Sequence, residues 1–242
     1  MPDIVASQAR TVLNFDNGST IRDRAAASAG GSVNTNGNGM FLGYFFHPAV
    51  KVNYRSFLNF DLSGESGTVS AVSLTLTRRN SGNFPTHFVV ASEAGDNLAT
   101  SDYIDGIVGA SSYPFTDDAT KFTDSAHNSN DGGGDGDTIT INLNAAAVSH
   151  ANAVIGTSDR FKCAIINSHD FNDSYDADDD GFSEALSIQG LNCYDTDSSD
   201  SNDHPVLNIT IAAVVPTIGA VKLDGAKIQI VSGKFLINWY LY

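Results

Sequence analysis

The chain is short of positive charge: among its 242 residues, 13 Lys and Arg stand against 28 Asp and Glu, for a net charge of −15. Nucleic-acid binding requires a basic face and anionic membranes attract basic segments, so this shortage argues against both kinds of partner. The chain also lacks any apolar run near the roughly 20 residues that a membrane helix requires. Its N-terminus has neither the basic start nor the apolar stretch of a signal peptide. We therefore expect a protein made without a leader, or one from which a leader has been removed.

Motifs of common catalytic sites are absent as well. The sequence contains neither a Gly-x-Ser-x-Gly elbow nor a phosphate-binding loop, and none of its 6 histidines has the spacing of a zinc pair. Acidic residues are so numerous that their presence identifies no particular pair of catalytic carboxylates. We therefore expect a protein that is not an enzyme.

Cysteine is nearly absent, with only Cys163 and Cys193 in the chain. Both lie in segments that we expect to be strands, where each would serve as a small buried apolar residue. Two cysteines do not by themselves establish a disulfide, so a bridge and a pair of buried thiols both stay open.

The most informative segment that is present reads YRSFLNFDLSGESGTVSAVSLTLT, from Tyr54 to Thr77. Apolar residues alternate with polar ones in Phe57–Leu62 and again in Val72–Thr77, and the residues between these runs are typical of a turn. Alternation with a period of two places one set of side chains on a core face and the other set outward. The segment therefore predicts a pair of antiparallel strands.

Similar patterns recur along the chain and fix the fold class. The other expected strands are Thr11–Phe15, Ser19–Arg22, Met40–Phe46, Phe84–Ala91, Thr138–Leu143, Phe161–Ile166, Ala185–Tyr194 and Pro205–Ile211. One helix is expected over 144–155, with Asn144 as its N-cap and Gly156 as its stop, and 92–137 is expected to be mostly loop. This spacing of short strands predicts an all-β fold, an antiparallel jelly-roll β sandwich over residues 1–212.

The charge changes near residue 213. Residues 1–212 carry 10 basic and 27 acidic residues, whereas residues 213–242 carry 3 lysines and 1 aspartate, a net charge of +2. This C-terminal β extension is apolar on both faces of its last expected strand, and such a strand requires cover on both sides. It is either a final strand of the main core or a docking and oligomerisation element. The residues expected to dock are Phe235, Ile237, Trp239, Tyr240, Leu241 and Tyr242.

Two runs, Arg55–Ser63 and Val69–Leu76, also carry a family resemblance. Together they resemble the DNRLRE-type modules, which are carbohydrate-binding-module-like β sandwiches. Two flanking runs, Ser19–Asp23 and Asp203–Thr210, are similar to the opening and closing strands of that family, although His204 stands where the family usually has arginine. The similarity covers roughly residues 10–212 and leaves out the C-terminal extension.

The resemblance implies a jelly-roll sandwich with a glycan-binding or structural role, and it implies no catalysis. Members of the family occur in secreted bacterial polysaccharide enzymes, in surface proteins and in bacteriophage virions. Because a fold alone does not determine function, these implications are expectations only.

A run of alternating aspartates, Asp176 to Glu184, has the pattern of the first half of a calcium loop. The ligands that it predicts are Asp176, Asp178, Asp180, Phe182 through its carbonyl, and Glu184. Ser187 stands where an EF-hand has its bidentate glutamate, so the loop is not an EF-hand. A calcium site and a solvated acidic loop without metal both stay open.

Glycan binding commonly uses exposed aromatic rings. The tyrosines in or near expected loops are Tyr44, Tyr103, Tyr113, Tyr175 and Tyr194. Each is either a platform for a sugar ring or a half-buried residue of the sandwich.

Two functions from different classes follow. The first is a structural protein of a bacteriophage virion (a capsid decoration, fibre or tail-associated protein) that binds other virion proteins or copies of itself. The second is a non-catalytic carbohydrate-binding module of a secreted or cell-surface bacterial protein, with cell-surface polysaccharide as its partner. Calcium is the cofactor under the first of the two alternatives for the loop from Asp176 to Glu184, and we expect neither nucleic acid nor membrane as a partner.

Overall fold

The computed structural model describes residues 2–16, 31–34, 39–47, 50–79, 86–110, 113–115, 118–128, 134–174, 187–196, 198–212, 227–231 and 234–238. The chain separates into two compact units, Met1–Ala212 and Ala213–Tyr242. That the second unit serves docking stays a prediction.

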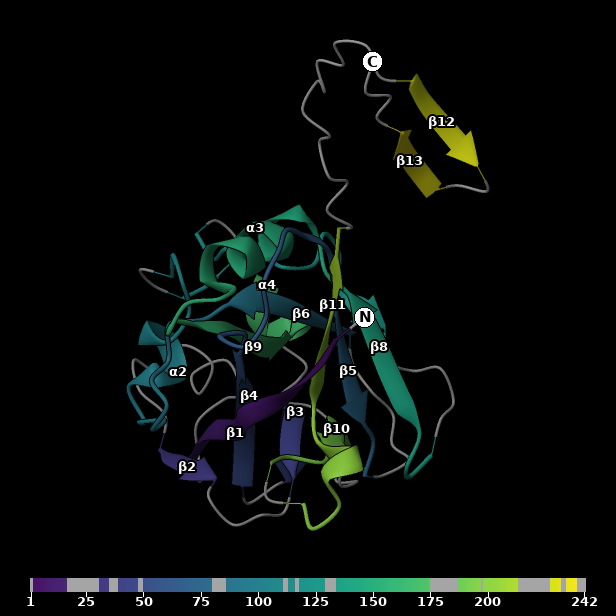
Figure 1. Cartoon of the computed structure of the whole chain (residues 1–242). Coiled ribbons are helices and arrows are strands. Elements are labelled where there is room, and N and C mark those ends of the chain that lie inside the picture. Colours follow the sequence, from purple (N-terminus) through teal and green to yellow (C-terminus); the bar gives the residue numbers. More distant parts are fainter. Residues whose placement is uncertain are drawn as a thin grey trace. The chain divides into compact units, whose positions relative to one another are not determined.

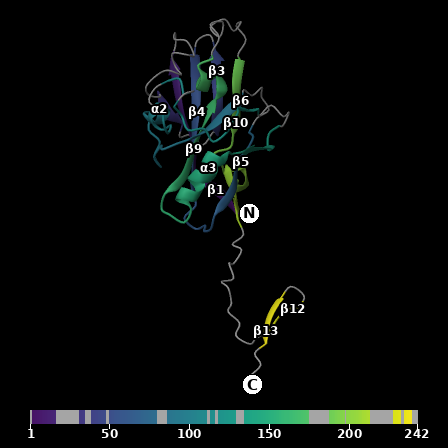
Figure 2. The same cartoon turned by 90° about the horizontal axis from the view of Figure 1, so that it is seen from above.

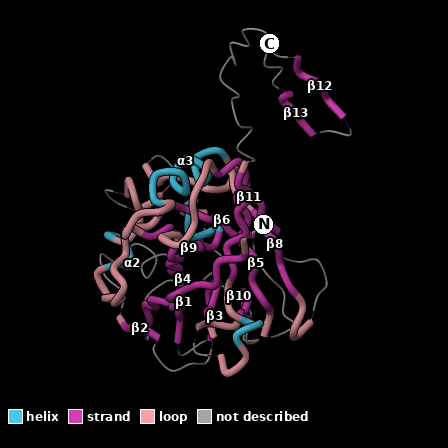
Figure 3. The backbone as a smooth tube through the Cα atoms, viewed as in Figure 1, coloured by secondary structure: helices cyan, strands magenta, loops and turns pink. Residues whose placement is uncertain are grey.

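The main unit consists mostly of antiparallel strands with a few short helices, which confirms the all-β class (Figure 1 and Figure 3). Its strands are β1 (Asp3–Asp16), β2 (Ser32–Asn34), β3 (Met40–His47), β4 (Val50–Asp61), β5 (Val69–Thr77), β6 (Thr86–Ala91), β7 (His127–Asn128), β8 (Thr138–Asn142), β9 (Arg160–Asn167), β10 (Ser187–Cys193) and β11 (Val206–Ile211). Its helices are α2 (Asp102–Asp105), α3 (Ala145–Val154), α4 (Ser168–Asn172) and the 3-10 turn η2 (Ser201–Asp203). None of the helices in the described ranges is long and apolar enough to cross a membrane.

Strand β1 belongs to two sheets and joins them. Its first residues, Asp3–Val5, pair with β11, and the order β1-β11-β5-β8 forms what we term sheet A. From Ala6 to Asp16 the same strand pairs with β4, and the order β7-β6-β9-β4-β1 forms sheet B, with β2 added to β1, β3 to β4 and β10 to β3. Figure 1 shows β1 running from the side of β11 to β2. An antiparallel sheet that turns back on itself in this way is consistent with a sandwich.

The inner core lies between the two sheets. Its large members are Leu58, Phe60, Leu74, Leu76, Val89, Ile139, Ile141, Phe161, Ile165, Leu207 and Ile209, all buried. In β5 the buried residues Val72, Leu74 and Leu76 alternate with more exposed ones, as predicted. Full burial of each such side chain stabilises the fold by about 1.5–3 kcal/mol.

An outer core covers the opposite face of sheet B. Its members are Val12, Phe57, Phe88, Val90, Tyr103, Ile104, Phe115, Ala164, Ile166 and Phe171. Residues of 92–126 pack there, and α2, which contacts β1, lies at the edge of the unit in both views (Figure 1 and Figure 2). Phe57 points away from the inner core as predicted, yet it is 2% exposed because this layer covers it.

Helix α3 begins and ends as the sequence predicts. The side chain of Asn144 accepts hydrogen bonds from the backbone N–H groups of Ala146 and Ala147, which have no partner within the helix. Gly156, just after the helix, has a φ of 70°. The predicted cap and stop are therefore confirmed.

The second unit contains the antiparallel pair β12 (Lys227–Val231) and β13 (Lys234–Asn238). Ile228 pairs with Ile237, and Ile230 pairs with Phe235. A two-stranded hairpin by itself is marginally stable in water, and this is the physical basis of the prediction that the unit docks on a further surface.

Candidate functional site

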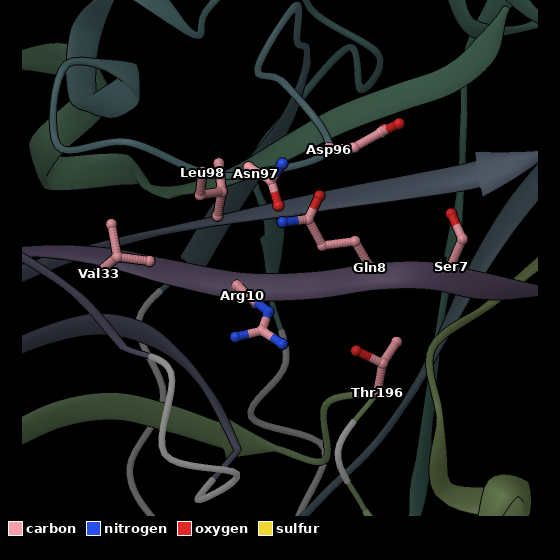
Figure 4. A pocket seen from close by; sticks show the side chains of 8 residues that line it. All are labelled: Ser7, Gln8, Arg10, Val33, Asp96, Asn97, Leu98 and Thr196. Atoms are coloured by element: carbon pink, nitrogen blue, oxygen red, sulfur yellow. The ribbon is translucent and has the colours of Figure 1, made fainter.

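The site begins with a β-bulge in β1. Ala6 is opposite Phe60 and Gln8 is opposite Asn59, so no residue of β4 stands opposite Ser7 in the register, although the Ser7 hydroxyl donates to the carbonyl of Asn59 over 3.0 Å. A bulge of this kind turns two successive side chains towards the same face of a sheet. Ser7 and Gln8 accordingly both point from β1 towards the segment 96–98 (Figure 4).

Asn59 of β4 holds the centre of the site. Its side-chain amide donates a hydrogen bond to Oε1 of Gln8 over 3.0 Å and another to Oδ1 of Asp96 over 3.1 Å. Asn59 is buried, so its own orientation is fixed by its surroundings. One buried amide thus positions a strand residue and a loop residue together.

The segment that carries Asp96 is anchored at both ends. The Ser92 hydroxyl donates to the carbonyl of Gly106 over 2.7 Å and accepts from the N–H of Ala94 over 3.1 Å. Further along, the N–H of Ala99 donates to Oδ2 of Asp102 over 2.7 Å. These hydrogen bonds therefore fix the backbone of the loop that carries the exposed side chains between the two anchor points.

These elements enclose a pocket of about 290 Å³. Its lining consists of Ser7, Gln8, Arg10, Val33, Asp96, Asn97, Leu98 and Thr196 (Figure 4). Two amides, two hydroxyls, a carboxylate and a guanidinium lie beside only two aliphatic side chains. This set of donors and acceptors suits a ligand rich in hydroxyl groups.

Arg160 of β9 borders the pocket. Its Nη1 donates to the Ser7 hydroxyl over 2.7 Å, and its Nε lies 3.4 Å from Oδ1 of Asp96. Its Nη1 also lies 3.9 Å from Asp61. Hydrogen bonds from Ser63 lower the pKa of Asp61, and Arg160 contributes to the same shift. The border of the pocket is therefore an array of charged hydrogen-bonding groups.

A buried ion pair links sheet B to the residues that cover its outer face, and no sequence motif predicted that its two members would pair. Arg55 of β4 and Asp170 of α4 form two hydrogen bonds of 2.7 Å, and both side chains are 0% exposed. Nη1 of Arg55 donates to the carbonyl of Tyr103 over 2.7 Å, and its guanidinium carbon lies 3.8 Å from the centre of that ring and 4.5 Å from that of Phe115. Arg55 thereby ties α2, next to the segment 96–98, to sheet B.

The five tyrosines proposed for glycan binding differ in their burial and in their contacts. Tyr103 is 0% exposed and presents no face to solvent, because it packs against Arg55. Tyr113 is partly buried and donates to Asp173 over 3.2 Å, and its pKa is raised by burial and by nearby carboxylates. Tyr194 donates to Asp135 over 3.3 Å. Of Tyr44 only the strand position is described, and Tyr175 lies outside the described residues. The pocket of Figure 4 has no tyrosine among its lining residues.

The remaining proposed sites fall largely outside the described residues. The calcium ligands Asp176, Asp178, Asp180, Phe182 and Glu184 lie there, and so do the docking residues Trp239, Tyr240, Leu241 and Tyr242. Phe235 and Ile237 are on β13. Within the ranges that are described, no three His, Cys, Asp or Glu side chains form a cluster that could hold a metal ion.

Cys163 and Cys193 are free thiols, both buried. Burial raises the pKa of each thiol. Of the two alternatives left open by the sequence, the structure contains the pair of buried thiols.

No family model and no curated protein matches this chain. The similarity of residues 54–77 to the DNRLRE-type modules therefore stays an interpretation of the sequence motif. Function has to be inferred from the polar pocket and from the second unit.

Proposed function

We propose that the main unit is a non-catalytic module that binds polysaccharide through the pocket of Figure 4. The observation that carries this proposal is the lining of Gln8, Arg10, Asp96 and Asn97, four side chains with planar polar groups. Two of the four, Gln8 and Asp96, are held by the buried amide of Asn59. Planar groups of this kind pair with neighbouring hydroxyls of a sugar ring, and their fixed positions reduce the entropy lost on binding.

Affinity electrophoresis tests this proposal. The protein is run in native gels that contain xylan, mannan, dextran or polygalacturonate, and we expect at least one polysaccharide to retard it. Asn97→Ala should weaken the retardation about five- to tenfold, because a hydrogen bond is worth roughly 1–1.5 kcal/mol. Asn142→Ala is the matched control, since Asn142 is an exposed asparagine on β8, in sheet A.

Unchanged mobility in all four gels would contradict the proposal. Equal retardation of the wild type and Asn97→Ala would place the binding surface elsewhere on the molecule.

A second candidate function is a structural component of a bacteriophage virion. The observation that favours it is the separation of residues 213–242 as a unit of their own, with a net charge of +2 beside a main unit of −17. An acidic main unit stays soluble, and a basic, apolar hairpin attaches to a partner surface. The partners are other virion proteins or further copies of this chain, and the docking residues are Phe235, Ile237 and Trp239–Tyr242.

Truncation after Ala212 tests this second function. The main unit contains its own inner and outer cores, so we expect it to stay folded and to lose any self-association of the full chain. Molar mass by light scattering, in calcium and again in chelator, provides the measurement. A truncated chain that is unfolded by circular dichroism would show instead that the extension is part of the core.

A further inference from the structure

We propose that the binding site is a two-part cleft across sheet B, and that its ligand is an extended, uncharged polysaccharide chain. This inference rests on the proposed polysaccharide-binding function and specifies the form and charge of the ligand. It follows from a second pocket, from the register of three strands and from the balance of charges around both pockets.

A second pocket, of about 380 Å³, adjoins the first. Asp96 lines both of them. The second is lined mostly by residues of β9, of α3 and of the segments that flank Asp96. The members that bear on ligand binding are Glu93, Asp96, His150, Asp159, Arg160 and Lys162.

Strand register places the two pockets along one line. Gln8 of β1 is opposite Asn59 of β4, and Asn59 is opposite Lys162 of β9. The three residues therefore form one row across neighbouring strands on the outer face of sheet B. Since strands lie about 4.8 Å apart, the row is roughly 10 Å long from the backbone of Gln8 to that of Lys162. The first pocket lies at the Gln8 end and the second at the Lys162 end.

The boundary between the pockets is polar. It consists of the Ser7 hydroxyl, the Arg160 guanidinium and the Asp96 carboxylate, joined by contacts of 2.7 Å and 3.4 Å. Arg160 and Asp96 keep 28% and 62% of their side-chain surface exposed. Exposed donors and acceptors at this boundary give a chain that crosses it further hydrogen bonds, which a wall of apolar side chains would not.

The charges of the described residues that line the two pockets cancel. Among them, Arg10, Arg160 and Lys162 stand against Glu93, Asp96 and Asp159, in a unit whose net charge is −17. An acidic polymer gains no net attraction from a balanced cleft and is repelled by the surrounding unit. A neutral chain has no such penalty, and the same six groups offer it hydrogen bonds.

Isothermal titration calorimetry with the full chain tests the inference. The probes are cellobiose and cellohexaose, mannobiose and mannohexaose, and xylobiose and xylohexaose, with a hexamer of galacturonate as the acidic probe. We expect a neutral hexasaccharide to bind about tenfold or more tightly than its disaccharide, because the longer chain engages both pockets at once. Lys162→Gln and Asp159→Asn should each reduce hexasaccharide affinity more than disaccharide affinity.

The outcomes distinguish a failure of the two-part cleft from a failure of the proposed polysaccharide-binding function. Equal affinities for the disaccharide and the hexasaccharide would overturn the two-part cleft while leaving a one-pocket glycan module. The same holds if neither Lys162→Gln nor Asp159→Asn changes the hexasaccharide affinity. Preference for the galacturonate hexamer would overturn the uncharged ligand. If none of the probes and none of the four gel polysaccharides binds, the polysaccharide-binding function itself fails, and the cleft fails with it.

Discussion

At the scale of single residues, the ion pair of Arg55 and Asp170 is the most costly to break. Both side chains are 0% exposed, so Arg55→Met leaves a carboxylate buried without its cation. We expect the free energy of unfolding to fall by about 3–5 kcal/mol, measured by urea denaturation. This loss of stability comes mainly from leaving the Asp170 carboxylate buried without a cation, rather than from losing the attraction within the pair.

Two further variants check that explanation. Arg160→Met breaks contacts with Asp61 and Asp96 that are partly exposed, so it should cost under about 1 kcal/mol. Arg55→Met combined with Asp170→Leu should recover much of the lost stability, because no unpaired charge remains. A double variant as unstable as Arg55→Met alone would contradict this explanation.

His87 makes the stability of the protein depend on pH. It is opposite His127 in the β6–β7 pair, and together they border a small apolar space with Leu42, Leu76, Ile139, Ile141 and Ile165. Burial lowers the pKa of His87 to about 4, and His127 adds to the shift, against an ordinary value of 6.5. The folded state therefore favours the neutral imidazole.

The direction of the effect follows from that shift. Above pH 6.5, His87 is neutral in both the folded and the unfolded state, and its contribution to the free energy of unfolding is fully present. As the pH falls towards 4, the unfolded chain takes up the proton first, so the free energy of unfolding decreases. The loss amounts to roughly 3 kcal/mol over this window. Urea denaturation at pH 7 and pH 4.5 should show a smaller acid loss in His87→Gln than in the wild type. Identical losses would mean that groups other than His87 cause the acid sensitivity.

At the scale of elements, regular periodicity could be predicted from the sequence and irregularity could not. Val72–Thr77 and the helix over 145–154 follow their patterns without interruption, and both were predicted. Strand β5 begins three residues earlier than predicted, at Val69, where its register with β11 shifts. Strand β1 was expected to begin at Thr11, but it begins at Asp3. The bulge at Ser7 breaks the period of two, and it thereby concealed the part of the strand that carries Gln8 and Arg10.

The outer core escaped prediction for a related reason. The segment 92–126 contains few regular elements, so its composition indicated loop, yet Tyr103 and Phe115 are fully buried within it. Outward residues of β4 such as Phe57 and Asn59 are covered as a result. The sequence did contain a signal for this outer core. Large aromatic residues stood in a segment expected to be loop, and Phe57 stood at an outward position of a strand.

The cap of α3 allows a direct test at this scale. Asn144→Ala removes the acceptor for two backbone N–H groups and also the side chain's hydrogen bond to Asp124. We expect a loss of about 1–2 kcal/mol in urea denaturation. Ser149→Ala, at an exposed position within the same helix, is the control and should leave stability unchanged or slightly higher. Equal effects of the two substitutions would mean that the cap contributes nothing.

At the scale of the whole molecule, the charged residues are divided unequally between the two units. The main unit carries a net charge of −17 together with the proposed cleft, whereas the second unit has a net charge of +2 and contains the β12–β13 hairpin. The change of charge near residue 213 was visible in the sequence. The cleft was not, because its row is assembled from Gln8, Asn59 and Lys162, which are far apart in the chain and meet only through strand pairing.

The most direct test of polysaccharide binding in this cleft is NMR of the nitrogen-15-labelled full chain, titrated separately with cellohexaose, mannohexaose and xylohexaose. With the ligand that binds, the largest amide shifts should occur at Gln8, Asn97 and Lys162, while sheet A positions such as Asn142 stay unchanged. Shifts concentrated on sheet A or on residues 213–242, or no shifts with any of the three, would contradict binding in the cleft.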